Sequence, residues 1–375
     1  MDKLHRKPPK KYPEMINRRL QQIRFTIEDL KLDGILVTHL PHIRYMTNFS
    51  GSSAYLFILQ DELHFITDDR YEMQVKGELY DLPGLKVHST REIWNYLKEN
   101  KVLGSAENIG FEADRMPYSE AVEIRTMIRP IKFKPTSGEI EPFLTAKDPM
   151  EIEYIEKTSK ISQKVYDIIK SEIKIGMTES EITNKIAYKS REFGSESVPF
   201  HIICTSGVNT ALPHIRPTSR KVKEGDLIMM EHGATFNGFA TTICRTVGIG
   251  EVDKEYFTAY NMILEAQNAT IKNLRPGINA SILESYARKI ILEGGYGDYY
   301  KTNLAHGVGI SYNENPIINQ RNSNHLVPEN CVLSIEPAVY VPNKFGMRIK
   351  DSVLVTKSGA RPITVPPDSL EIISG

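Results

Sequence analysis

The sequence contains very little cysteine. Only three cysteines, Cys204, Cys244 and Cys331, occur in 375 residues, and they lie far apart. An odd number of cysteines cannot form a complete disulfide framework, and no C-x-x-C pair is present for zinc binding or redox chemistry. This usage predicts a reducing, cytoplasmic compartment.

An excess of charge of one sign and long apolar segments are also absent. The 47 Lys and Arg residues balance 47 Asp and Glu residues, so the formal net charge is zero. Such a chain lacks the electrostatic attraction by which proteins bind nucleic acids or anionic bilayers. No run of the sequence approaches the roughly 18 consecutive apolar residues of a transmembrane helix. We therefore expect neither a nucleic acid nor a membrane as a partner.

The length and the order of the sequence patterns predict two domains. A chain of 375 residues is long enough for about two domains of roughly 100 to 200 residues each. Strand and helix patterns alternate between residues 12 and 145, which is typical of an α/β domain. Pro142 and the turn Lys147-Asp-Pro149 follow, and proline interrupts both helices and strand ladders. We place the boundary there, which gives domains 12–145 and 146–375.

The second domain shows the same order of patterns twice. Helical periodicity covers 151–171 and 178–193, the latter opened by the capping sequence Thr178-Glu-Ser-Glu181, and extended segments follow to 247. A second helix pair, 256–273 and 280–292, precedes another extended region, 306–355. This repetition predicts a pseudo-duplicated α+β domain.

Charged residues interrupt three apolar strands of this domain. Glu231 follows the apolar run 227–230, Glu336 follows 331–335, and Arg348 and Lys350 share one face of a third strand because strand positions i and i+2 point the same way. A buried acid requires a cation, a metal or hydrogen bonds. These four side chains predict either a structural ion-pair network or a functional site, and both interpretations remain open.

Histidines cluster in the same domain. His201, His214 and His232 lie within 32 residues, and His306 lies in the glycine-rich run 305–309. His214 directly follows a proline, and the resulting rigid loop is suited to aiming a general base, although the residues also fit an ordinary loop.

The order of these motifs resembles the pita-bread peptidase family, which comprises Xaa-Pro aminopeptidase (aminopeptidase P), prolidase and their metal-free relative creatinase. The resemblance covers about residues 16 to 369, through the segments 43–51, 67–71, 213–214, 231–246, 306–309, 335–337 and 346–351. It implies an α+β protein in which a C-terminal pita-bread domain, with a curved antiparallel sheet, follows an α/β creatinase-type N-terminal domain. It also implies a homodimer that acts on a small molecule or a short peptide.

The resemblance also places the metal ligands of the peptidases on this chain. The family binds two divalent metals through an Asp, a second Asp eleven residues later, a His, a Glu and a last Glu; these positions match Glu231, Thr242, His306, Glu336 and Lys350. The second Asp and the last Glu bridge the two metals in the family, so both bridges are missing here. We therefore expect a degenerate metal site and no cofactor. A single divalent metal on Glu231, His306 and Glu336 is the alternative.

Without the bridges, the similarity to creatinase implies a metal-independent mechanism. His214 matches the histidine that serves creatinase as general acid/base, and Arg348, Glu336, Glu231 and His306 are the other candidate catalytic residues. Candidate substrate contacts are Asn313, Glu314, Lys350, Cys244 and Thr242. Asn313 replaces a histidine that stabilises the tetrahedral intermediate in the peptidases, and Cys244 replaces a carboxylate of creatinase, so we do not expect creatine itself as the substrate.

Three functions remain open. The first is a metal-independent hydrolase of a C–N bond in a small amide, guanidino or peptide substrate, which the retained His214 and Arg348 favour. The second is a catalytically inactive member that acts as a binding module, which the loss of both bridges favours. The third is a genuine Xaa-Pro aminopeptidase or dipeptidase with an atypical mononuclear metal site.

Overall fold

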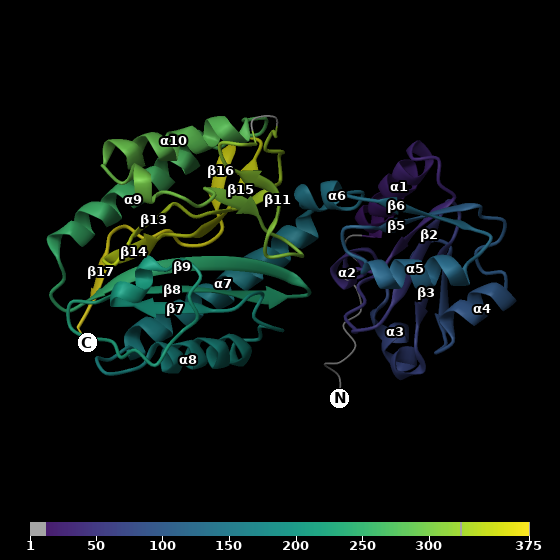
Figure 1. Ribbon diagram of the computed structural model, residues 1–375, viewed down its shortest axis with the longest axis horizontal. Helices are drawn as coiled ribbons and strands as arrows, with labels where there is room; N and C mark the ends of the chain where they lie inside the picture. Colours follow the sequence, from purple (N-terminus) through teal and green to yellow (C-terminus); the bar gives the residue numbers. More distant parts are fainter. Residues whose placement is uncertain (1–12, 323–324, 375) are drawn as a thin grey trace. The chain divides into compact units, whose positions relative to one another are not determined.

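The computed structural model describes residues 13–322 and 325–374. These residues form two compact units that divide between Phe143 and Leu144 (Figure 1). The predicted domain start at residue 12 and the last residue, 375, lie outside the described residues. The domain bounds 12–145 and 146–375 therefore stay a prediction.

The first unit is built on a six-stranded sheet in the order β4-β3-β2-β1-β5-β6. All neighbouring strands are parallel except β2, which is antiparallel to both β1 and β3. The strands are β1 (Gly34–Val37), β2 (Tyr55–Leu59), β3 (Leu63–Thr67), β4 (Leu85–Ser89), β5 (Asn108–Glu112) and β6 (Lys132–Thr136). The helices are α1 (Pro13–Asp29), α2 (Leu40–Thr47), α3 (Glu72–Glu78), α4 (Ile93–Glu99) and α5 (Tyr118–Met127), and α6 (Glu141–Thr145) lies at the boundary.

The second unit opens with two helices whose starts are set by local capping. Asp148 and Glu151 form a capping box at the start of α7 (Pro149–Glu172), and Thr178 and Glu181 form another at α8 (Glu179–Glu192). Each box satisfies two backbone N–H groups that have no partner inside the helix. The helix start predicted from Thr178 and Glu181 is thus confirmed.

The first sheet of this unit has the order β17-β9-β8-β7. Its strands are β7 (Ile203–Ser206), β8 (Leu227–Phe236), β9 (Phe239–Ile249) and β17 (Glu371–Ile373). Asn237 and Gly238 both have positive φ and join β8 to β9 in a tight hairpin, a turn that favours this residue pair. The hairpin fixes the register that places Glu231 opposite Cys244.

The second half of the unit repeats the plan. Helices α9 (Lys254–Asn273) and α10 (Ala280–Glu293) precede a five-stranded sheet in the order β11-β10-β12-β15-β16 and a separate hairpin of β13 and β14. The strands are β10 (Ala305–Gly307), β11 (Glu314–Ile318), β12 (Val332–Ile335), β13 (Ala338–Val341), β14 (Phe345–Arg348), β15 (Asp351–Thr356) and β16 (Gly359–Pro362). Figure 1 shows α7 and α8 on one side of the sheets and α9 and α10 on the other.

Each helix pair buries its own apolar core. One cluster joins residues of α7 and α8 to β7, β8 and β9, and a second joins α9 and α10 to the strands of the second half. Burial of apolar surface at about 25 cal/mol per Å² is the main force that holds these layers together. The two helix-and-sheet halves agree with the predicted pseudo-duplicated α+β domain.

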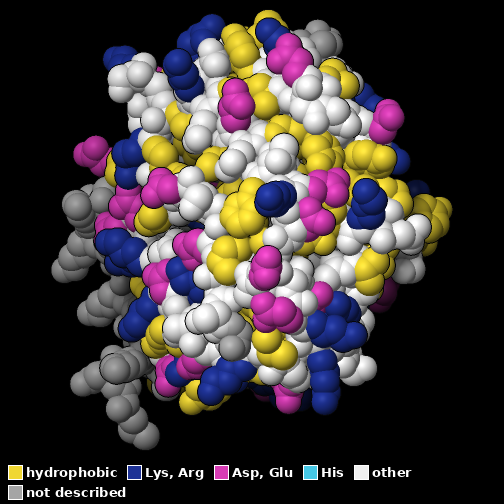
Figure 2. All heavy atoms as spheres, turned by 90° about the vertical axis from the view of Figure 1, so that its left-hand side faces the viewer, with side chains coloured by type: hydrophobic (Ala, Val, Ile, Leu, Met, Phe, Trp, Pro, Cys, Tyr) yellow, Lys and Arg dark blue, Asp and Glu magenta, His cyan; other side chains and the backbone are white. Residues whose placement is uncertain are grey.

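The surface carries both signs of charge. On the face in Figure 2, Lys and Arg side chains alternate with Asp and Glu side chains, in keeping with the zero formal net charge. Within the part of the chain that the structure describes, none of the helices is both long enough and apolar enough to cross a bilayer.

Candidate active site

Four charged side chains meet in the interior of the second unit. Glu231 lies on β8, Glu336 directly after β12, Arg348 at the end of β14, and Lys350 between β14 and β15. Two backbone hydrogen bonds hold Lys350 beside the hairpin of β8 and β9. The Lys350 N–H donates to the Cys244 carbonyl over 3.1 Å, and the Cys244 N–H donates to the Lys350 carbonyl over 3.2 Å. Since Glu231 lies opposite Cys244 in register, Lys350 and Glu231 are brought together. We call these four residues the charge cluster.

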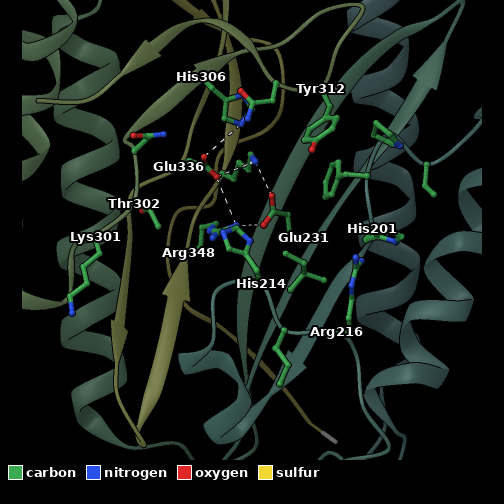
Figure 3. A pocket seen from close by; sticks show the side chains of 18 residues that line it. His201, His214, Arg216, Glu231, Lys301, Thr302, His306, Tyr312, Glu336 and Arg348 are labelled. Carbon is green, nitrogen blue, oxygen red and sulfur yellow. Dashed lines mark hydrogen bonds and ion pairs between the residues drawn. The ribbon is translucent and has the colours of Figure 1, made fainter. Parts of the chain in front are cut away.

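The charge cluster is closely paired. Lys350 Nζ lies 2.8 Å from Glu231 Oε1 and 3.0 Å from Glu336 Oε2. The guanidinium of Arg348 bonds Glu231 and lies 3.8 Å from Glu336 Oε2. Figure 3 shows the side chains of Glu231, Glu336 and Arg348 directed toward one another. The ion-pair network that the sequence allowed among these four residues is therefore present.

The cluster is internally neutral. Burial alone would raise the pKa of Glu231, but the charges of Arg348 and Lys350 outweigh it and lower the pKa to about 2. Burial alone would lower the pKa of Lys350, but Glu231 and then Glu336 outweigh it and raise it. Two carboxylates therefore face two cations near neutral pH, and the cluster carries no excess negative charge.

His306 borders the cluster as a neutral imidazole. Its Nδ1 lies 2.9 Å from the carbonyl oxygen of Gly307, which can only accept, so Nδ1 carries the proton. Its Nε2, 3.6 Å from Glu336 Oε1, then presents a lone pair toward the cluster. Burial, followed by the charge of Lys350, lowers the pKa of His306, which keeps the ring neutral.

A cavity of about 860 Å³ opens beside the cluster. This volume suits a small organic ligand. His214 and Arg216 reach it from the loop that follows the short 3₁₀ helix η2 (Gly207–Ala211), and both are exposed. In Figure 3, Arg216 and Lys301 lie on opposite flanks of the charge cluster. Besides the cluster and His214, the wall includes Pro199, Phe200, His201, Arg216, Lys301, Thr302, Asn303, His306, Tyr312 and Asn313.

The structure brings most, but not all, of the candidate residues to this cavity. Glu231, Glu336, Arg348, Lys350, His214, His306 and Asn313 line it. Three predicted substrate contacts do not. Thr242 is buried and its hydroxyl lies 2.7 Å from that of Ser334, Cys244 is fully buried, and Glu314 pairs with the buried ammonium of Lys147. The structure gives no support for direct substrate contact by these three.

Arg216, Lys301 and Tyr312 line the cavity but were missed from the sequence. They stand on separate loops, and no local pattern distinguishes them from other surface residues. The proline-rich segment around Arg216 is the only signal that was available, since it also carries His214.

His232, the residue after Glu231, makes the free energy of unfolding depend on pH. The side chain is buried, and within residues 13–322 and 325–374 neither ring nitrogen has a hydrogen-bond partner. Burial, followed by the charge of Arg245, lowers the pKa of His232 to about 3. Because the unfolded chain binds a proton near pH 6.5 and the folded chain near pH 3, stability is complete above pH 6.5 and falls at lower pH by up to about 1.4 kcal/mol per unit.

We expect His232→Leu to remove this dependence. Urea unfolding at pH 7.5, 6.0 and 5.0 tests the expectation, and these values avoid the titration of Glu231, which lies lower. The free energy of unfolding of the wild type should fall more steeply than that of the variant. Equal slopes in both proteins would show that His232 does not titrate in this way.

Comparison with known proteins identifies the class. Residues 153–357 match the model of metallopeptidase family M24, and residues 19–143 match the creatinase/prolidase N-terminal domain. The fold and the site thus define a peptidase-type hydrolase with a creatinase-like N-terminal domain. The chain belongs to metallopeptidase family M24, so the predicted family, fold class and enzyme class are confirmed.

Several relatives align over nearly their whole length. The chain is 30% identical over 360 residues to the uncharacterized peptidase YqhT of Bacillus subtilis, which covers 95% of this chain and 100% of the relative. It is 32% identical over 351 residues to the Xaa-Pro dipeptidase of Pyrococcus furiosus, and the alignment covers 92% of this chain and 97% of the relative. Among solved structures, the Xaa-Pro dipeptidase from Bacillus anthracis superposes with a TM-score of 0.90 at 30% identity. The superposition covers 96% of this chain and 100% of that structure.

Family membership corrects one expectation. The missing bridges led us to expect no cofactor, with a single divalent metal as the alternative, but the chain belongs to a family of metallopeptidases, for which a metal is the general rule. The expectation of no cofactor is therefore wrong.

The residues at the family's metal positions nevertheless fit two divalent ions poorly. Two of the five positions are held by a hydroxyl and an ammonium, and both acids of the cluster are already neutralised by Arg348 and Lys350. Among the described residues, no group of three or more His, Cys, Asp or Glu side chains is arranged to hold a metal ion. We therefore assign no reaction step to a metal.

Restoring the family's carboxylates should strengthen metal binding at these positions. The variant Glu231→Asp, Thr242→Asp and Lys350→Glu supplies both bridging positions and removes the ammonium, so we expect it to bind Mn²⁺ at least tenfold more tightly than the wild type, a difference of about 1.4 kcal/mol in binding free energy. Isothermal titration calorimetry measures the difference. The single variant Glu231→Asp, which changes neither bridge, is the matched control. An unchanged affinity in the triple variant would contradict the residue-by-residue match.

Proposed function

We propose that this chain hydrolyses a C–N bond in a substrate of about dipeptide size, with His214 as the general acid/base. The observation that carries the proposal is the shared cavity, whose wall joins His214 to the charge cluster, His306 and Asn313. The relatives support a peptide bond before proline as the bond that is cleaved, because two of them are named Xaa-Pro dipeptidases.

The site residues divide the chemistry between them. His214 is exposed on the cavity wall, so it can accept a proton from an attacking water and return it to the leaving nitrogen. The paired charges of Glu231, Glu336, Arg348 and Lys350 are held rigidly and orient the substrate without rearranging during the reaction. Asn313 can donate a hydrogen bond to the substrate but cannot transfer a proton.

A panel of substrates tests the proposal. The panel contains Xaa-Pro dipeptides, the reversed Pro-Xaa dipeptides, longer Xaa-Pro peptides, and small amide and guanidino compounds. Each is incubated with the protein with and without added Mn²⁺, Co²⁺ or Zn²⁺, and product amines are measured. We expect turnover of at least one dipeptide-sized compound and slower turnover of longer peptides. If the protein hydrolyses none of these compounds under any of the conditions, the proposal is contradicted.

A binding module without turnover is the second candidate. It is favoured by the charge cluster, in which Arg348 and Lys350 already neutralise both acids. On this alternative, a dipeptide raises the thermal stability of the protein without being consumed. A ligand at 100 times its dissociation constant adds about 2.7 kcal/mol of apparent stability, which a thermal-shift measurement detects.

Two further features belong to the proposal. A homodimer is expected from the family resemblance, and light scattering at micromolar concentration checks it; a monomer would count against it. A cytoplasmic location is supported by the three cysteines, all of which are buried and free of disulfide bonds.

A further inference from the structure

The loop that carries His214 is fastened at both ends by one buried carboxylate. Glu179, the first residue of α8, is fully buried. Its Oε1 accepts hydrogen bonds from the backbone N–H and the hydroxyl of Ser206, over 2.7 and 2.9 Å. Its Oε2 accepts from the backbone N–H and the hydroxyl of Thr218, over 2.9 and 2.7 Å. Ser206 and Thr218 flank the segment 207–217, which contains His214 and Arg216.

Other contacts fit the same arrangement. Asn209, inside the loop, donates its side-chain amide to both oxygens of Glu179, over 3.1 and 3.3 Å. The backbone N–H of Ser180 donates to the Thr218 carbonyl over 3.1 Å, so the first turn of α8 holds the same end of the loop a second time. Hydrogen bonds to an ionised acceptor are about twice as strong as neutral ones, so this carboxylate holds both ends of the loop firmly.

The carboxylate is expensive to bury, and its donors compensate for that cost. An ionised group taken out of water must be paired or fully hydrogen-bonded. The guanidinium of Arg220 pairs with Asp226 over 2.6 Å and is linked to the Glu179 carboxylate through the hydroxyl of Ser206, to which it donates, also over 2.6 Å. The donors of Ser206, Asn209 and Thr218 therefore satisfy Glu179 directly, and releasing either end of the loop leaves buried lone pairs without a partner.

We propose that Glu179 is a positioning residue, which holds the loop 206–218 closed and thereby keeps His214 at the cavity wall. This inference rests on the proposed role of His214. A displacement of about 1 Å from a productive geometry can cost on the order of a hundredfold in rate, so a tie at both ends of the loop matters for proton transfer. Between its two ends the loop is also held by a neutral contact, the bond from the Gly346 N–H to the Thr210 hydroxyl, over 2.9 Å.

The variant Glu179→Gln tests the structural half of the inference. Glutamine keeps the size of the side chain but has one acceptor oxygen, so it can satisfy only one end of the loop. Hydrogen exchange of residues 206–218, followed by mass spectrometry, should become at least tenfold faster, with the rest of the second unit unchanged. Glu181→Gln is the matched control, because Glu181 lies in the same helical turn, is exposed and bonds only Thr178 among the described residues. Equal exchange in both variants would overturn the inference.

A double-mutant cycle tests the link to His214. We expect Glu179→Gln to lower kcat by about 10- to 100-fold with KM changed less than about threefold, and to cause no further loss in the His214→Ala background. A general structural defect would reduce turnover by the same factor in both backgrounds, and that result would overturn the inference. If Glu179→Gln does not fold, Thr218→Val removes one donor to Glu179, together with the hydrogen bonds that the Thr218 hydroxyl accepts from Arg220 and Asn209, and should give the same pattern at smaller size.

The two measurements also separate the inference from the proposed function. Faster exchange of the loop, together with turnover that does not depend on His214, would contradict the proposed mechanism and the positioning role. The same result would still show that Glu179 stabilises the loop. Unchanged exchange, together with turnover that depends on His214, would contradict the positioning role alone.

Discussion

Replacing Lys350 by alanine is expected to lower the free energy of unfolding by about 3 to 5 kcal/mol. The side chain is buried and pairs with both Glu231 and Glu336. Its removal leaves the buried carboxylate of Glu231 and the partly buried one of Glu336 with Arg348 as their only remaining cation in the described cluster. The cost of an uncompensated buried charge, more than the lost attraction, accounts for the expected loss. Urea unfolding at pH 7 measures it.

Three variants separate charge from packing. Lys350→Met keeps most of the apolar stem, so it should be nearly as destabilising as Lys350→Ala if charge decides the effect. Adding Glu336→Gln to Lys350→Met should recover part of the loss, because one unpaired acid is removed. Lys344→Ala is the matched control, since Lys344 is exposed and lies 3.8 Å from Glu255, a pair worth about 1 kcal/mol or less. A loss below about 1 kcal/mol for Lys350→Ala would show that the pairing is not what holds these acids.

Loss of His214 is the second change with a large expected effect. General acid/base groups contribute about 10²- to 10⁴-fold, so His214→Ala should lower kcat by that order. The fold should be unaffected, because His214 is exposed and no described contact depends on its ring. His306 is the competing proton carrier, since its Nε2 presents a lone pair toward the cluster. Because the proposed function assigns proton transfer to His214, His306→Ala should lower kcat less than His214→Ala does.

The sequence predicted the features that depend on local or periodic signals. The long helices of the second unit follow from apolar periodicity and from capping residues such as Thr178 and Glu181. Helix α1 carries the same kind of signal, because Ile16, Leu20 and Ile23 are spaced to lie on one face and are all buried. The ion pairs of Lys350 were predictable because two acids on buried strands require a cation.

Some elements of the first unit carry weak local signals. Helix α2 (Leu40–Thr47) is short and has a proline in its first turn, so its sequence looks like a loop. Strands β4 (Leu85–Ser89) and β6 (Lys132–Thr136) are the two edges of their sheet and are largely not buried, so they lack apolar alternation. Their pairing is decided by contacts with β3 and β5, which the local sequence does not reveal.

The composition of the cavity depends on the fold as a whole. Arg216, Lys301 and Tyr312 come from loops that are far apart in the sequence, and only the folded chain brings them to one wall. The opposite error, a predicted site residue that does not line the cavity, occurs at Thr242, Cys244 and Glu314. Their positions in the family motif suggested the site, but their side chains are buried or bonded to other residues. A motif fixes which strand a residue occupies, but packing decides what its side chain contacts.

The role of His214 is tested by the steady-state turnover of one hydrolysed dipeptide by the wild type, His214→Ala and His306→Ala, measured side by side at a fixed concentration of added metal ion. If His214 transfers the proton, kcat is about 10²- to 10⁴-fold lower for His214→Ala, with an unchanged unfolding transition and a smaller loss for His306→Ala. Turnover by His214→Ala equal to that of the wild type would contradict the assignment of His214 as the proton-transfer residue.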